Sequence, residues 1–218
     1  PLNGWFTVAT ERGPGIGSFL ELVRTYAARA AAGERPRHTL LFVATGGHEV
    51  TAPGLEHVFG CLDRDRVVSY IHFGAGIAGK GFVEVAGTVH ETGFPEPNRL
   101  LIISENPLLE AIGESAFRTK PGAHPLLSIP PRALNPGEQQ FVYNLGVPMV
   151  TISGAGIYHH APADTPEKTS PELIDPMVRA YVEIVDALLE LDADLVRQSN
   201  LVAATIAPAA EPPTCEGE

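Results

Sequence analysis

The sequence predicts an α/β protein with a three-layer, mostly parallel sheet and helices on both faces. Short apolar runs alternate along the chain with segments whose apolar residues recur at helical spacing. Runs that are apolar on both faces are typical of parallel strands buried beneath helices. The predicted strands are residues 39–44, 66–73, 100–104 and 148–153, with a less regular candidate at 83–89.

The segments between these runs predict the helices. Pro14 suits the first turn of a helix that continues past Tyr26, and short helices are expected over residues 53–60 and 107–116. The longest apolar stripe starts after Ser170, which can cap that helix. Its members are Leu173, Ile174, Met177, Val178, Tyr181, Val182, Val185, Leu188 and Leu189. Residues 119–137 are rich in Pro and Gly and are predicted to form a loop.

Residues 1–195 are predicted to form one hydrolase-like domain, and residues 196–218 a flexible Pro/Ala-rich tail. The chain opens on a strand-like segment without a signal-peptide pattern, so we expect a removed leader or a fragment lacking its amino-terminal part. A net charge of −11 argues against nucleic acid and anionic membranes as partners. We expect a soluble protein that acts on a small molecule or peptide. The sequence favours the cytoplasm and leaves the oligomeric state open.

Three of the predicted strands end in polar residues, and these residues predict a shared site. They are His48-Glu49, His72 and His159-His160. Because parallel strands bring their carboxyl ends to one edge of a sheet, these side chains should converge there. Glu11 and Arg12 precede the first helix, whose amino terminus favours negative charge.

Each of these residues also has a structural interpretation. A single histidine at a strand end is often a hydrogen-bonded structural residue, Glu11-Arg12 could form a surface ion pair, and Glu49 could be solvated. Asp164 is expected to make local turn hydrogen bonds. Convergence on one sheet edge favours the functional interpretation.

The chain resembles the di-zinc aminopeptidase family, which includes glutaminyl cyclases, over residues 2–192. Tyr158-His159-His160-Ala161-Pro162-Ala163-Asp164-Thr165 is close to that family's Tyr-His-Thr-Pro-Ala-Asp-Thr. Weaker matches occur in the same order: Glu11-Arg12-Gly13-Pro14-Gly15, Gly46-Gly47-His48-Glu49, Tyr70-Ile71-His72-Phe73 and Glu138-Gln139-Gln140-Phe141. The resemblance implies a phosphorylase/hydrolase-like fold of the zinc-exopeptidase type and a metal-dependent hydrolase.

Carried over by position, the resemblance assigns roles to particular residues. Metal ligands would be Glu11, His48, His72 and His160, with His159 a near alternative to His160. His48 or Glu49 would act as general base, and Arg12, Tyr158 and His159 would contact substrate. Because histidine replaces acid at two ligand positions, we expect one divalent metal ion, with zinc favoured, rather than two. A metal-free acid–base site and an inactive pseudo-peptidase that binds ligands or serves as an assembly subunit are the alternatives.

Overall fold

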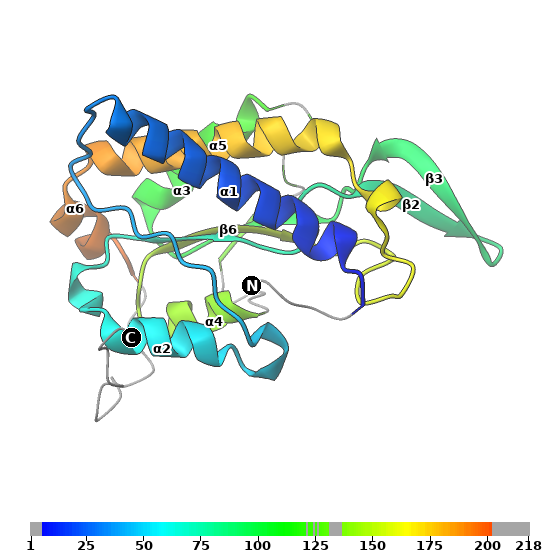
Figure 1. The fold of residues 1–218 in the computed structure, drawn as a ribbon, viewed down its shortest axis with the longest axis horizontal. Helices are drawn as coiled ribbons and strands as arrows, with labels where there is room; N and C mark the ends of the chain where they lie inside the picture. Colours follow the sequence, from blue (N-terminus) through cyan, green and yellow to red (C-terminus); the bar gives the residue numbers. More distant parts are fainter. Residues whose placement is uncertain (1–5, 121, 124, 126, 131–136, 202–218) are drawn as a thin grey trace.

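The computed structural model describes residues 6–120, 122–123, 125, 127–130 and 137–201, and its fold is α/β (Figure 1). The helices are α1 (Ala9–Ala31), α2 (Pro53–Cys61), α3 (Pro107–Arg118), α4 (Glu138–Asn144), α5 (Ile174–Glu190) and α6 (Ala193–Gln198). The strands are β1 (Tyr70–Phe73), β2 (Lys80–Val85), β3 (Thr88–Pro95), β4 (Arg99–Ile103), β5 (Leu127–Ile129) and β6 (Met149–Gly154). Among these residues, no helix combines the length and apolarity needed to cross a membrane.

The main sheet is mixed, which corrects the prediction of a mostly parallel one. Its order is β1-β6-β4-β5, with β1 parallel to β6, β4 parallel to β5, and β4 antiparallel to β6. The reversal follows from the antiparallel hairpin β2–β3, which extends from the body of the molecule (Figure 1). A hairpin returns the chain to its starting edge, so β4 enters the sheet opposite the carboxyl end of β6.

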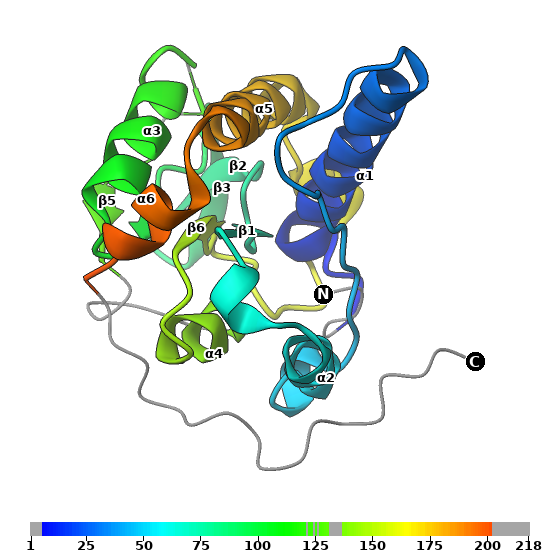
Figure 2. The same cartoon turned by 90° about the vertical axis from the view of Figure 1, so that its left-hand side faces the viewer.

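Helices pack on both faces of this sheet. Figure 2 shows α1, α3 and α5 on one side and α2 and α4 on the other. The larger core lies on the first side, where Ile152 and Leu101 of the sheet join Tyr181 of α5 and Phe117 of α3. A smaller cluster on the second side contains Leu55, Phe59, Val142 and Val147.

Three local predictions were wrong. Residues 39–44 run extended but pair with no described strand, and Leu41 is 60% exposed. The predicted loop over 119–137 contains β5, which pairs with β4 and is too short to show a sequence period. Ser170 does not cap α5 and hydrogen-bonds Glu172 instead, because a short 3-10 turn (Pro171–Leu173) precedes the helix.

The boundaries of other elements also differ from those predicted. α1 begins at Ala9, which places Pro14 inside the helix rather than in its first turn. At the other end of the chain, α6 includes the start of the predicted tail, where Val196 is fully buried. Residues 202–218 of that tail lie outside the described residues.

Tyr181 links α5 to the strands β1 and β6. Its hydroxyl donates to the carbonyl of His72 at 2.9 Å and accepts from the amide of Ile152 at 3.2 Å, and the side chain is fully buried. Tyr181→Phe removes both of these hydrogen bonds from a fully buried position, so we expect a loss of about 1–3 kcal/mol in urea unfolding. Tyr26→Phe is the control, since its hydroxyl bonds Asp186 near the surface. Equal losses in the two variants would contradict this account.

Candidate functional site

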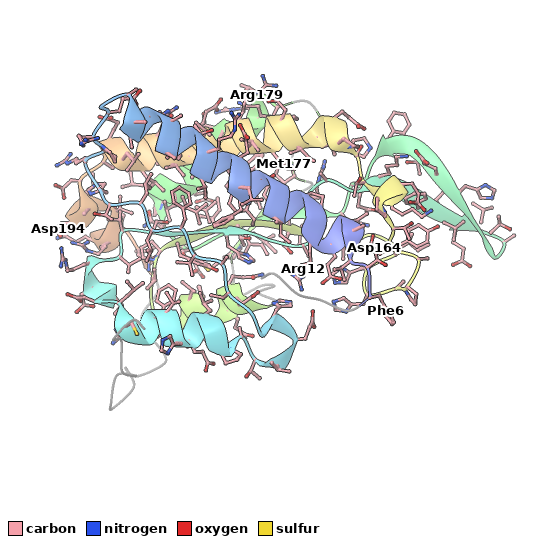
Figure 3. The ribbon with its side chains drawn as sticks, viewed as in Figure 1. Phe6, Arg12, Asp164, Met177, Arg179 and Asp194 are labelled. Carbon is pink, nitrogen blue, oxygen red and sulfur yellow. The ribbon has the colours of Figure 1, made fainter. Side chains whose placement is uncertain are left out.

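The amino terminus of α1 is held by a carboxylate from a distant loop. Asp164 accepts hydrogen bonds from the Thr10 amide at 2.9 Å, the Thr10 hydroxyl at 2.6 Å and the Glu11 amide at 3.2 Å. A carboxylate suits a helix amino terminus, where amides lack partners and the helix dipole is positive. Val8, the residue at the cap position, makes no side-chain cap bond, so Asp164 takes over that role. These bonds fix the backbone that carries Glu11, and Figure 3 shows Asp164 beside this end of α1.

Glu11 forms a group with the two adjacent histidines of the loop after β6. Each of these three residues, Glu11, His159 and His160, offers one potential ligand atom. The three atoms lie within 4.8 Å of one another. Nε2 of His160 is 3.3 Å from Oε1 of Glu11, and the two imidazole rings stack at 4.1 Å. His160 adopts a left-handed backbone with φ of 58°, a conformation uncommon outside glycine and often found at functional sites. A carboxylate and two imidazoles are a ligand set suited to zinc.

Arg12 lies between two acids. Its Nη2 is 2.8 Å from Oε1 of Glu11 and 3.1 Å from Oε1 of Glu49, and the side chain is only 6% exposed. The guanidinium therefore neutralises buried negative charge that would otherwise be costly. Arg12 was predicted to contact substrate, and in the structure this nitrogen is shared by the two protein carboxylates.

A second group of titratable residues centres on Glu138, at the start of α4. Its Oε2 is 2.5 Å from Nδ1 of His48 and 3.9 Å from Nε2 of His72. Nδ1 of His72 is 2.9 Å from the Thr151 hydroxyl across the β1–β6 pair. Glu49 connects the two groups, because its Oε1 also lies 3.9 Å from Nε2 of His48.

Burial and charge shift the pKa values in the second group in a consistent way. Burial lowers the pKa of His72 to about 4, against the raising effect of Glu138, so His72 is neutral at pH 7. Burial alone would raise the pKa of Glu138, but the hydrogen bond from His48 and the charges of His72 and His48 bring it down to about 2. With His72 neutral at pH 7, the hydrogen bond between His48 and Glu138 is the main cause of this lowered pKa. Glu138 is then an ionised carboxylate in contact with an imidazole, an arrangement able to move protons.

We expect His72 to make the protein acid-sensitive. The unfolded chain binds a proton on this histidine near pH 6.5, whereas the folded protein does so only near pH 4. The free energy of unfolding should therefore fall by about 3 kcal/mol between those pH values. In urea titrations across this range, His72→Asn should flatten the fall and His90→Asn, in the exposed part of β3, should not. An unchanged slope in His72→Asn would contradict the assignment.

A cavity of about 870 Å³ opens beside both groups. Glu11, Arg12, His72 and Glu138 line its polar part. Its remaining walls are largely apolar and come from α1, α2, β1, α5 and residues 37–45 and 62–69. Further polar or charged lining residues are Arg37, His38, Asp63, Arg66 and Arg197. A large apolar cavity with a few convergent polar groups is the usual form of a ligand site.

The structure divides the predicted site residues into two connected groups. Glu11, Arg12, His159 and His160 lie together, and His48 and His72 gather around Glu138. Tyr158 lies elsewhere, with its ring against Phe82 and beneath the ammonium group of Lys168. Asp164 was expected to make local turn hydrogen bonds, and its carboxylate instead binds the amino terminus of α1. Glu138 was missed as a site residue, although it opens one of the motifs matched to the aminopeptidases.

No protein-family model matches this chain, and no curated protein sequence matches it. The resemblance to aminopeptidases therefore rests on the sequence motifs alone.

Proposed function

We propose that this protein is a divergent metal-dependent hydrolase, of the aminopeptidase type, acting on an amide-like small substrate or a peptide. The observation that carries the proposal is the approach of Glu11, His159 and His160 to one another beside a second, proton-handling group. The proposed fold is the phosphorylase/hydrolase-like one of zinc exopeptidases, with a mixed sheet between two helical layers.

The residues of the first group fit a single divalent cation, with zinc favoured. Both carboxylate oxygens of Glu11 are buried and lack a hydrogen bond of good geometry, although Oε1 is close to Arg12 and His160. Burying a charged oxygen without hydrogen bonds is costly, and a bound cation would remove that cost. Three protein ligands leave a further position for water or substrate, as in catalytic zinc sites. A zinc ion there would polarise a substrate carbonyl and lower the pKa of a bound water.

The second group would handle protons. We assign His48 as the general base, one of the two bases that the resemblance implies. Glu138 is the carboxylate that orients it, because a carboxylate with a pKa of about 2 is itself a weak base at neutral pH. The short contact between Glu138 and His48 orients both, and Thr151 orients the neutral ring of His72. Arg12 holds the carboxylates of Glu11 and Glu49 in place.

Hydrolysis of aminoacyl p-nitroanilides by the zinc-loaded protein tests this proposal. We expect Glu138→Gln to lower kcat by about 100-fold or more, because loss of the carboxylate that orients a catalytic histidine costs at least about that much. Its zinc content should stay at the wild-type level. The matched control is Glu183→Gln. Glu183 lies on α5, away from the site, and its carboxylate pairs with Lys120. No turnover of any substrate by the zinc-loaded wild type would reject the proposal.

One observation favours a second candidate, an inactive pseudo-peptidase that binds a ligand or serves as an assembly subunit. The Arg12 guanidinium already supplies a fixed positive charge between Glu11 and Glu49. Such a charge can replace a cation structurally without providing its chemistry. Under this candidate the wild type would take up no zinc.

A further inference from the structure

The cavity described above is lined both by β1 and by residues 39–45. One wall is β1, which stands at the edge of the main sheet among the described strands. The opposite wall includes residues 39–45, which run extended without a strand partner in the described part of the chain. Figure 2 shows this segment running past the open edge of β1 on its way from α1 to α2.

The open edge of β1 presents backbone groups to the cavity. The amides of Tyr70 and Gly74 donate to β6, at Pro148 and Ile152. Because successive amides of a strand point to opposite sides, those of Ile71 and Phe73 point away from β6. An unpaired strand edge is a template for another strand.

The walls also indicate which strand would fit. Leu22 and Phe19 of α1 cover one side of the cavity, and Leu55 and Phe59 of α2 cover the other. A strand between these helices would be buried on both faces and would need apolar side chains on both. Leu41 and Phe42, now 60% and 36% exposed, are apolar residues on the 39–45 segment that such a strand would meet.

The direction of the added strand follows from the directions of β1 and of residues 39–45. β1 ends at His72 and Phe73, and residues 39–45 lead to His48. His72 and His48 both contact Glu138, so the two walls run in the same direction. A strand parallel to both would end beside Glu138 and Glu11 and would bring its last side chains to the candidate site.

We propose that this cavity binds, in trans, one extended apolar peptide, which adds to the sheet parallel to β1. The proposal does not depend on hydrolysis, because it rests on the open strand edge and the apolar walls. Addition of a strand to a sheet edge is an established mode of peptide recognition, in which backbone hydrogen bonds give affinity.

The probe is a fluorescent peptide that copies Met149–Gly154 with flanking lysines and carries Thr151→Val and Ser153→Val, so that both faces are apolar. The copied sequence already pairs in parallel with β1 on its other edge. We expect saturable binding to the full chain in fluorescence anisotropy. Hydrogen exchange should show new protection at the amides of Ile71 and Phe73. A peptide with proline in place of Val150 and Ile152 lacks two backbone donors and should bind at least about tenfold more weakly.

A protein variant tests the same edge. Ile71→Pro removes an outward amide, which an edge strand tolerates, and should weaken binding at least about tenfold. Ile71→Val keeps that amide and should bind like the wild type. If Ile71→Pro fails to fold, the proline peptide decides the same question on the wild-type protein.

Three results would overturn the proposal. The first is equal binding of the probe peptide and the proline peptide. The second is protection at the edges of β3 or β5 in place of β1. The third is absence of binding together with amides of Ile71 and Phe73 already protected in the free protein, because residues 39–45 would then occupy the position themselves.

Discussion

Glu11→Ala is expected to lower the zinc affinity of the protein by about 100-fold or more. Glu11 is the buried member of the proposed metal group, and its carboxylate is the only negative charge in that group. Without it, two imidazoles, one of them on an exposed residue, would have to hold the ion. Loss of a ligand should cost at least as much as loss of a supporting residue, which typically costs about 10–100-fold. Competition with a chromogenic chelator measures the affinity.

Two further variants test whether ligation by Glu11 controls the zinc affinity. His160→Ala should lower zinc affinity at least about tenfold, because it removes one imidazole but leaves His159 beside Glu11. Glu49→Ala is the matched control: it also takes a carboxylate from Arg12, yet Glu49 is not a member of the metal group. An equal loss of affinity in Glu49→Ala and Glu11→Ala would mean that the charge around Arg12, rather than ligation by Glu11, controls binding.

Asp164→Ala is expected to cost about 2–4 kcal/mol of folding free energy, measured by urea unfolding. The substitution removes three hydrogen bonds from one buried carboxylate and leaves the Glu11 amide without its acceptor. It also removes a negative charge from the amino terminus of α1. Because those bonds position Glu11, zinc affinity should fall as well.

Asp192→Ala is the control for this prediction. Asp192 caps α6 by accepting from the amides of Asp194 and Leu195, and its side chain is 56% exposed. An exposed cap of this kind contributes less than a buried carboxylate with three hydrogen bonds. If Asp164→Ala costs no more than Asp192→Ala, the bonds to α1 do not hold the fold or the site as described.

Several features of the fold could be predicted from short-range patterns. The apolar stripe of α5 and the runs that became β4 and β6 are local signals, and the structure has each of them. The direction of β4 was not predictable in the same way, because it depends on the hairpin that precedes it. Residues 39–44 have the composition of a buried strand, but composition does not supply the partner that a strand requires.

The candidate site could also be predicted only in part from the sequence. Polar residues after predicted strands led to His48, His72 and His159-His160, since a sheet edge brings such positions together. The partition into a metal group and a proton-handling group depends on side-chain distances that spacing does not determine. Asp164 and Thr10 are 154 positions apart in the chain, so no local pattern could reveal their contact. Glu138 opens a short helix rather than ending a strand, and the sheet-edge argument therefore missed it.

Metal content, determined by mass spectrometry on wild type, Glu11→Ala and His72→Ala after zinc loading and dialysis, tests the central claim most directly. The account predicts about one equivalent of zinc in the wild type and in His72→Ala, because His72 lies with Glu138 rather than with the metal group. It predicts none in Glu11→Ala. A wild type without zinc, or zinc lost from His72→Ala but retained in Glu11→Ala, would contradict a mononuclear site at Glu11, His159 and His160.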